Sequence, residues 1–363
     1  MPNVIFQIEG GSEVAIACQV GDNLLELARR ANVAIDAPCS GNGSCGKCRV
    51  KLIAGSLETF PSRHISDEEY AAGWRLSCNC KVLTDCTVFV PDIASAYQSR
   101  MKTADLSSPQ EIAIFEDAKA QMMAGGIAFE NNFLSAILEM AEPTLDDTMP
   151  DVERFQWAVQ AAIGAEKVEV PFFVMRKLAT VLRENNFTVC VKGERKGDSF
   201  LCMDVCPPAD TAIVGCAIDI GTTTVTMVFV DLTDGRLLAK GSSGNGQIRY
   251  GADVITRIIQ QGRPGGKKNL QDAIIKETLN PIIANLCKSA GISANAILRM
   301  CVAANTTMNH LFVGVDAEPV RMEPYIPSFF SWEGLKAGDL KLPANPLADV
   351  QIAPNIGSYV GGD

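Results

Sequence analysis

The stretch Ala37-Pro-Cys-Ser-Gly-Asn-Gly-Ser-Cys-Gly-Lys-Cys-Arg49 places three cysteines, Cys39, Cys45 and Cys48, in a glycine-rich loop. A fourth cysteine, Cys78, follows further along the chain. Four thiolates are the ligands that a [2Fe–2S] cluster requires, two on each iron. Glycine permits the tight turns and the close approach of backbone N–H groups that a loop around the sulfides needs. The sequence therefore predicts a [2Fe–2S] cluster bound by these four cysteines.

Two other chemistries are open for this loop, a structural zinc site and a set of disulfide bonds. Zinc knuckles favour two Cys-x-x-Cys pairs, whereas the loop has one such pair, Cys45 and Cys48, and five residues separate Cys39 from Cys45. The total of 13 cysteines is odd, and most lie in apolar runs, unlike a secreted disulfide framework. The pattern favours the iron–sulfur cluster and a reducing, anaerobic cytoplasm.

Residues 1–93 are expected to form one domain around this loop. A helix capped by Asp22 precedes the loop, and a capping box at Ser66 opens a short helix after it. Cys80 and Cys86 compete with Cys78 as the fourth ligand, and otherwise they are buried strand thiols. Alternation and turn residues predict strands over 4–8, 14–18, 47–53, 76–82 and 86–90.

This order of elements resembles that of the β-grasp [2Fe–2S] ferredoxins. The spacing of the loop cysteines resembles that of the adrenodoxin-like members of that group. The resemblance implies that Cys78, which ends the pattern Arg-Leu-x-Cys, is the last ligand.

Length, composition and charge bound the remaining possibilities. A chain of 363 residues suggests two or three domains, and 47% hydrophobic with 20% charged residues provides for packed cores. The formal net charge of −10 argues against a nucleic-acid partner and against anionic membranes. No apolar run approaches bilayer length, and the first residues lack the features of a signal peptide. We expect a soluble, cytoplasmic protein.

The central part of the chain carries no evident chemistry. Residues 94–107 are polar and weakly patterned, which predicts a linker. Residues 108–210 are expected to form a small middle domain, whose first helix begins with a capping box at Ser108. Cys190, Cys202 and Cys206 suggest either a second metal site or, preferably, buried strand positions. Further helices are predicted over 152–163 and 171–185, and strands over 187–192 and 199–205.

The second informative stretch is Ile213-Val-Gly-Cys-Ala-Ile-Asp-Ile-Gly-Thr-Thr-Thr-Val-Thr-Met-Val-Phe-Val-Asp231. It predicts a strand that ends near Asp219, a turn, and a second strand. An aspartate at a strand end can hold Mg²⁺ through water, and a glycine turn with hydroxyls can present donors to nucleotide phosphates. The alternative is a plain hairpin whose threonines favour strands. The candidate nucleotide-binding residues are Asp219, Gly221, Thr222, Thr223 and Thr224.

The context of this stretch favours a nucleotide site. A third strand, helices near 251–261 and 270–289, a strand over 298–304 and another helix follow it. This is the order of a ribonuclease-H-like half of an actin, Hsp70 or sugar-kinase ATPase, so residues 211–363 are predicted to form such a half-domain. Asn305 and Thr306 either face the nucleotide or simply cap their helix. Asp253 is a further candidate near the phosphates, and His310 is expected to be a helix-surface or packed residue rather than a ligand or a catalytic base.

The combination of both motifs in one chain resembles the reductive activators of corrinoid proteins. The resemblance rests on four segments and covers nearly the whole chain: Asp219-Ile-Gly-Thr-Thr-Thr224, Tyr250-Gly-Ala-Asp-Val-Ile255, Ala304-Asn-Thr-Thr-Met308 and Tyr359-Val-Gly-Gly-Asp363. It implies an α+β and α/β multidomain protein with a [2Fe–2S] cluster and Mg-ATP as cofactors. It also implies transfer of an electron to Co(II) of a corrinoid protein, which regenerates Co(I).

The family resemblance carries three further expectations. Family members continue past the position of Asp363 with a second half of the ATP site. This chain is therefore expected either to be C-terminally truncated or to be completed by a second polypeptide, and by itself to lack efficient ATP hydrolysis. The partners are expected to be a corrinoid protein and a low-potential electron donor, and the chain is expected to form a homodimer. Two alternatives are a ferredoxin-type electron-transfer module for a reductase or oxygenase, without ATP use, and a small-molecule kinase with an appended ferredoxin domain.

Overall fold

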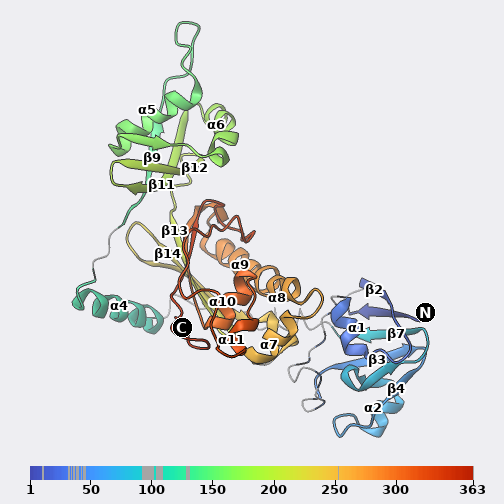
Figure 1. Cartoon of the computed structure of the whole chain (residues 1–363). Helices are drawn as coiled ribbons and strands as arrows, with labels where there is room; N and C mark the ends of the chain where they lie inside the picture. Colours follow the sequence, from blue (N-terminus) through green and yellow to red (C-terminus); the bar gives the residue numbers. More distant parts are fainter. Residues whose placement is uncertain are drawn as a thin grey trace.

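The computed structural model describes residues 1–9, 12–31, 33, 35, 37, 41, 43, 46–91, 102–103, 109–127, 131–251 and 253–362. Within these ranges the chain forms sheets of five, four and six strands, and a two-stranded sheet accompanies the first. Each of the three larger sheets has its own hydrophobic core. The third unit lies between the first and the middle unit (Figure 1).

The first unit is a mixed sheet in the order β2-β1-β7-β3-β5, against which α1 packs. The central pair, β1 and β7, is parallel, and its neighbours are antiparallel. This arrangement confirms the predicted β-grasp order. Its elements are β1 (Asn3–Ile8), β2 (Ser12–Ala17), α1 (Leu24–Arg30), β3 (Arg49–Ala54), β4 (Leu57–Thr59), α2 (Asp67–Ala71), β5 (Trp74–Leu76), β6 (Cys80–Val82) and β7 (Cys86–Val90).

Two local predictions in this unit were wrong. The residue that caps α1 is Asn23 rather than Asp22, because the Asn23 side chain accepts hydrogen bonds from the first backbone N–H groups of the helix. The strand predicted over 76–82 is interrupted by a 3₁₀ turn, Ser77–Asn79. The interruption arises because β5 pairs with β3 whereas β6 pairs with β4, so the chain changes sheets at this turn.

The middle unit is a four-stranded sheet in the order β10-β12-β11-β9, with α5 and α6 packed on it. The predicted helices and strands are confirmed. Cys190, Cys202 and Cys206 are buried on its strands, and no group of three metal-ligating side chains forms in the described part of the unit. Its elements are β9 (Phe133–Glu139), α5 (Asp151–Ile163), β10 (Lys167–Glu169), α6 (Phe172–Glu184), β11 (Thr188–Lys196) and β12 (Ser199–Cys206).

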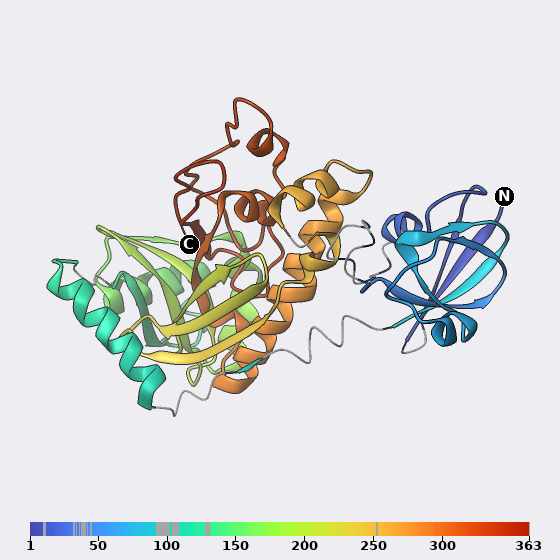
Figure 2. The same ribbon diagram turned by 90° about the horizontal axis from the view of Figure 1, so that it is seen from below.

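The segment between these units contributes two elements to the third unit. Strand β8 (Lys102–Thr103) pairs with the edge of the six-stranded sheet, although the sequence predicts a linker there. Helix α4 (Pro109–Ala124) lies beside this sheet rather than on the middle sheet (Figure 2), and Lys119 donates to the Asp234 carbonyl at 3.4 Å. The predicted cap Ser108 lies outside the described residues.

The third unit is a mixed six-stranded sheet in the order β17-β16-β13-β14-β15-β8. Strands β13, β16 and β17 are parallel, and β13, β14 and β15 form an antiparallel meander. The predicted order of strands and helices is confirmed. The elements are β13 (Val214–Ile220), β14 (Thr224–Asp231), β15 (Leu237–Gly244), α7 (Val254–Gln261), α8 (Gly266–Ile274), α9 (Asn280–Ala290), β16 (Ile297–Ala304), α10 (Thr306–Val313), α11 (Glu318–Arg321) and β17 (Asp349–Ile352).

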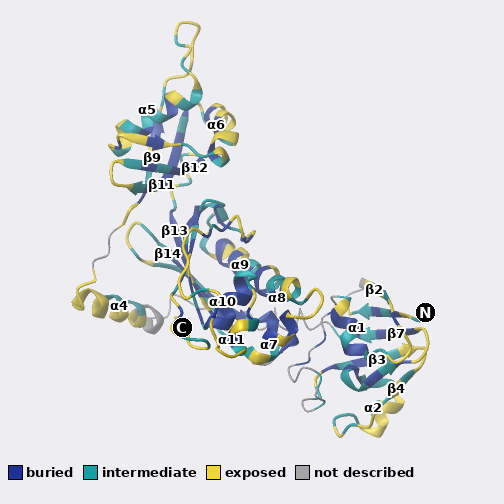
Figure 3. Cartoon of the chain, in the orientation of Figure 1, coloured by how far each residue is buried: buried dark blue, intermediate teal, exposed yellow. Residues whose placement is uncertain are grey.

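Burial distinguishes the two faces of this sheet. Figure 3 shows buried residues in the sheet and in α8 to α10, whereas α4 is largely exposed. Along β13, buried Ile218 and Ile220 alternate with exposed Ala217 and Asp219. One face therefore packs on helices, and the other presents Asp219. Among the helices that the structure describes, none combines the length and apolar character needed to cross a membrane.

Candidate functional site

The first part of the site is a pair of sulfur atoms. Cys48 lies immediately before β3 and Cys78 lies in the 3₁₀ turn, and their Sγ atoms are 3.3 Å apart. The backbone holds the two segments together, since Ser77 N donates to the Cys48 carbonyl at 2.8 Å. Cys39 and Cys45 lie outside the described residues, so the full set of four ligands stays a prediction.

The geometry and protonation of this pair fit metal binding. Tetrahedral metal–sulfur bonds of about 2.3 Å place two sulfurs on one metal about 3.7 Å apart. The hydrogen bond with Cys78 lowers the pKa of the Cys48 thiol, which favours the thiolate that binds iron. Burial instead raises the pKa of both Cys80 and Cys86 to about 11. Of the three candidates, Cys78 is the one whose sulfur lies against that of Cys48, and this contact favours Cys78 as the fourth ligand.

Asn23 is a residue of this region that sequence reasoning missed. Its side-chain oxygen caps α1, while its Nδ2 donates to the Cys78 carbonyl at 2.8 Å. Helix α1 is thereby tied to the turn that carries Cys78. An asparagine directly before the apolar face of a helix is the available sequence signal, although it predicts the cap and not the second contact.

The second part of the site is the turn between β13 and β14, here called the Gly221–Thr224 turn. Asp219 lies near the end of β13, where it is paired with Thr226 on β14 and Ala303 on β16. It lines a hollow of about 440 Å³ on the face of the sheet opposite the packed helices, here called the open face. A Cβ on Gly221 would lie 2.7 Å from the Thr224 carbonyl oxygen, so this close turn requires glycine.

The carbonyl oxygens of this turn accept hydrogen bonds from buried donors. Asn245, which is fully buried, donates from Nδ2 to the Gly221 carbonyl and from its backbone N–H to the Thr223 carbonyl, both at 2.8 Å. The guanidinium of Arg257 donates to the Thr222 carbonyl. These bonds direct the carbonyl groups towards the interior, and the threonine side of the turn remains partly exposed. Such a backbone arrangement is suited to an anion.

Asn305 and Thr306 follow Ala304, which pairs with Ile220 directly before the Gly221–Thr224 turn. Asn305 caps α10 and accepts a hydrogen bond from Met308 N at 3.0 Å. The Thr306 hydroxyl is buried and donates to the carbonyls of Gly357 and Val360. The contacts of Asn305 correspond to the simple helix-cap alternative, and Thr306 holds the segment 357–360. Their nucleotide role stays a prediction.

Two other residues from the sequence analysis have structural contacts. His310 is buried, stacks on Phe329 with ring centroids 4.5 Å apart, and accepts from Ser328 N at 3.0 Å. It is therefore a packed residue, which is one of the two structural roles predicted for it. Asp253 caps α7 by accepting a hydrogen bond from Thr256 N at 2.8 Å. This contact does not connect Asp253 with the Gly221–Thr224 turn.

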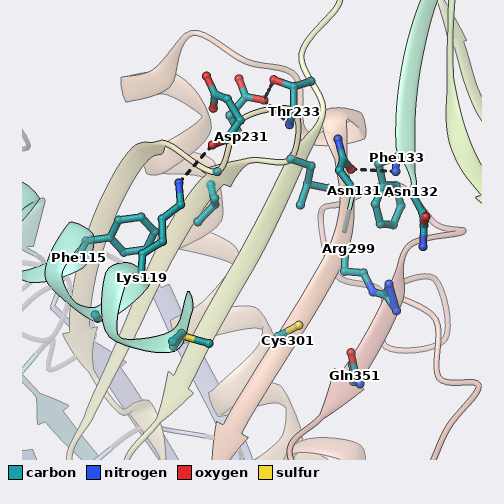
Figure 4. Close-up of a pocket in the computed structure, with 16 residues that line it drawn as sticks. Phe115, Lys119, Asn131, Asn132, Phe133, Asp231, Thr233, Arg299, Cys301 and Gln351 are labelled. Carbon is teal, nitrogen blue, oxygen red and sulfur yellow. Dashed lines mark hydrogen bonds between the residues drawn. The ribbon is translucent and has the colours of Figure 1, made fainter. Parts of the chain in front are cut away.

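A larger hollow of about 510 Å³ lies elsewhere on the open face (Figure 4). Its walls come from α4, the start of β9 and the turn after β14, and Arg299 contributes from β16. Cys301 and Gln351 line both hollows, so the two are neighbours. None of the described candidate site residues lines this larger hollow.

Helix α1 also contacts the third unit. Glu26 of α1 forms an ion pair with Arg263, which follows α7, and Asn269 of α8 donates to the Arg29 carbonyl at 3.4 Å. Glu26 and Arg263 are 41% and 42% exposed, so the pair contributes about 0–1 kcal/mol. The helix that is tied to Cys78 therefore lies against the helical layer that contacts the Gly221–Thr224 turn.

We expect the substitution Arg263→Glu to weaken this contact, because it places two carboxylates opposite each other and leaves the other ion pair of Glu26, with Arg29, in place. Small-angle X-ray scattering at low salt should show a larger radius of gyration, whereas Arg263→Lys, which keeps the charge, should keep the wild-type value. Lys167→Glu, which breaks an exposed ion pair with Glu169, is the matched control. Equal scattering of Arg263→Glu and the wild type would contradict a role for this ion pair.

The sequence matches three described families. Residues 7–83 match the 2Fe-2S iron-sulfur cluster binding domain, residues 124–206 match the RACo linker region, and residues 214–363 match the RACo middle region. The first match covers the Cys48–Cys78 pair, and the third covers the Gly221–Thr224 turn. The two RACo matches together span most of the chain.

Individual relatives agree with these matches. The corrinoid activation enzyme RamQ of Eubacterium limosum is 38% identical over 152 residues, which are 42% of this chain and 26% of that protein. A component of the Na(+)-translocating NADH-quinone reductase of Pseudoalteromonas atlantica is 37% identical over 91 residues, which are 24% of this chain and 22% of that component. The chain thus spans about a quarter of the length of these curated relatives.

A solved structure agrees with these matches over the whole chain. The structure described as a reductive activator for corrinoid, iron-sulfur protein aligns with 100% of this chain and with 56% of its own, at a TM-score of 0.52 and 30% identity. Because this alignment and the matched regions agree, the chain belongs to the family of reductive activators of corrinoid proteins.

Proposed function

We propose that the protein transfers an electron from a [2Fe–2S] cluster to Co(II) of a corrinoid protein, which regenerates Co(I), and that this transfer depends on ATP. The observation that carries the proposal is the Cys48–Cys78 sulfur pair, in the same chain as the Gly221–Thr224 turn. An electron carrier needs the first, and a nucleotide-dependent activator needs both. The family relationship supports a corrinoid protein as the partner.

The proposed ligands of the cluster are Cys39, Cys45, Cys48 and Cys78. When bound, the cluster supplies one-electron redox chemistry. Ser77 N donates to the Cys48 carbonyl, and Asn23 holds the Cys78 carbonyl. These residues fix the backbone on both sides of the sulfur pair and so hold its geometry. Cys48 is buried and Cys78 is half-buried.

The proposed role of the Gly221–Thr224 turn is to bind the phosphates of Mg-ATP, and that of Asp219 is to position Mg²⁺ through water. Reduction of a corrinoid from Co(II) to Co(I) is uphill for many donors. A ligand shifts such an equilibrium only through different affinities for the two states. ATP would therefore bind more tightly to the complex in which the acceptor is easier to reduce, for instance one with altered cobalt coordination.

Three further proposals concern the setting of this reaction. The electron donor would be a low-potential carrier, and the active species would be a homodimer. All cysteines in the described residues are free thiols, which supports a reducing, cytoplasmic location.

The proposed function predicts a nucleotide-dependent activation of a corrinoid protein. The full-length protein is mixed, without oxygen, with a Co(II) corrinoid protein and with titanium(III) citrate as the reductant. The formation of Co(I) is followed by its absorbance, with and without Mg-ATP. We expect Mg-ATP to increase the rate of Co(I) formation, and Mg-ADP to increase it much less. Equal rates with and without nucleotide would instead support a simple ferredoxin-type carrier, and phosphate transfer to a metabolite would support a kinase.

A further inference from the structure

Arg257 is the largest fully buried side chain in the described part of the chain. Its Nε donates to the Gly251 carbonyl at 2.9 Å, and its Nη1 lies 3.4 Å from the Gln247 side-chain oxygen and 3.2 Å from the Met308 sulfur. Its Nη2 donates to the Thr222 carbonyl. One guanidinium therefore links the segment before α7 and the buried Met308 side chain to the middle of the Gly221–Thr224 turn.

These contacts use the fork geometry that distinguishes arginine from lysine. The three nitrogens of the guanidinium reach acceptors in different directions from one rigid plane. A lysine ammonium at the end of a flexible chain can approach one of them closely, but it cannot hold all of them at once. The position is therefore specific for arginine, and not merely for a positive charge.

The contact with Thr222 determines which backbone groups the turn presents. The Gly221 and Thr223 carbonyls are held by Asn245, and the Thr222 carbonyl, which lies between them, is held by Arg257. With all three carbonyl oxygens turned inward, the N–H and hydroxyl groups are the donors left for an incoming anion. The guanidinium also places a positive charge against the inner side of the turn.

We infer that Arg257 is a positioning residue for the phosphates of the nucleotide. It acts through the backbone of the Gly221–Thr224 turn, not by contact with the ligand. The inference rests on the proposed role of this turn in nucleotide binding. The segment before α7 provides a contrast, because Arg249 is also buried there but pairs with Glu277, with Nη2 and Oε1 2.6 Å apart. The two arginines share burial and charge and differ in their contact with the turn.

The experiment compares Arg257→Gln and Arg257→Lys with the control Arg249→Gln. Affinity for Mg-ATP is measured by calorimetry without oxygen, thermal unfolding is followed for each variant, and hydrogen–deuterium exchange is measured on peptides that contain Gly221–Thr224. Loss of a buried charged hydrogen bond corresponds to about tenfold or more in affinity. We expect this loss in Arg257→Gln, a smaller loss in Arg257→Lys, and faster exchange of the turn in both. Arg249→Gln should lower the unfolding temperature and leave affinity and turn exchange unchanged.

The outcomes separate this inference from the proposed function. Wild-type affinity in both Arg257 variants would overturn the inference while the nucleotide site stood. If the wild-type protein bound no Mg-ATP, the nucleotide part of the proposed function would fail, and the inference would fail with it. If Mg-ATP bound to the wild type but the turn exchanged as slowly in Arg257→Gln as in the wild type, only the inference would be overturned. If Arg249→Gln changed affinity as strongly as Arg257→Gln, the effect would be one of general stability, and the inference would also be wrong.

Discussion

Replacement of Cys78 by serine is expected to remove most of the bound iron and to abolish electron transfer. A serine hydroxyl does not supply the thiolate that iron–sulfur clusters require. The wild-type protein should contain about two irons per chain, as a [2Fe–2S] cluster demands. Iron analysis and the visible absorption of the oxidised protein, purified without oxygen, measure the loss.

Cys80→Ser is the matched control for this substitution. Cys80 lies two residues beyond Cys78, is fully buried on β6, and contacts the Thr59 hydroxyl at 3.7 Å. We expect Cys80→Ser to keep its iron and to lose some stability, because it places a hydroxyl in the core. If Cys78→Ser retained its iron and Cys80→Ser lost it, the fourth ligand would be Cys80 and not Cys78. Wild-type iron in both variants would contradict a role for either.

Replacement of Asp219 by alanine is expected to weaken Mg-ATP binding by about tenfold or more, as for loss of a charged hydrogen bond. The carboxylate near the end of β13 is the group proposed to hold Mg²⁺ through water. The variant should therefore lose the nucleotide-dependent part of corrinoid activation while keeping its cluster. Calorimetry without oxygen gives the affinity, and iron content shows that the first unit is intact.

Asp234→Ala provides the control for a lost carboxylate on the same hairpin. Asp234 is 56% exposed, lies in the turn after β14, and forms an ion pair with Arg236. Its removal should change neither nucleotide affinity nor activation. Undiminished ATP-dependent activation in Asp219→Ala would show that the role assigned to this carboxylate is wrong.

Local patterns were sufficient to predict most elements of the chain. The alternation of apolar residues in 4–8 and 86–90, the capping box at Ser66 and the strand–turn–strand pattern around Gly221 each involve residues that are close in sequence. The structure confirms these elements. Each such signal depends on backbone preferences that neighbouring residues determine.

The contacts that orient the site were not predictable in this way. The side chain of Asn23 contacts the Cys78 carbonyl, although the two residues are 55 positions apart in the sequence. Arg257 contacts the Thr222 carbonyl, 35 positions away. Nothing in the local sequence distinguishes Arg257 from a solvent-exposed arginine on an amphipathic helix. The interruption of the strand at Cys78 likewise depends on separate pairing partners for β5 and β6. Such features arise from tertiary packing.

Helix α4 illustrates the same limit for domain organisation. Its helical character follows from local sequence, but its position beside the six-stranded sheet depends on contacts with the turn near Asp234. Strand β8, which precedes it, consists of two residues, Lys102 and Thr103, that pair with Ser242 and Gly241. A pairing this short carries no recognisable periodicity in the sequence.

The most direct test of the central claim is a single-turnover measurement of the electron transfer itself. The protein is reduced, freed of excess reductant, and mixed with a Co(II) corrinoid protein and Mg-ATP without oxygen, and both paramagnetic signals are followed by electron paramagnetic resonance. We predict that the reduced-cluster signal and the Co(II) signal disappear together in a one-to-one ratio, and that Cys78→Ser shows neither the cluster signal nor the loss of Co(II). Persistence of both signals in the wild-type mixture would contradict the proposal that this protein reduces a corrinoid.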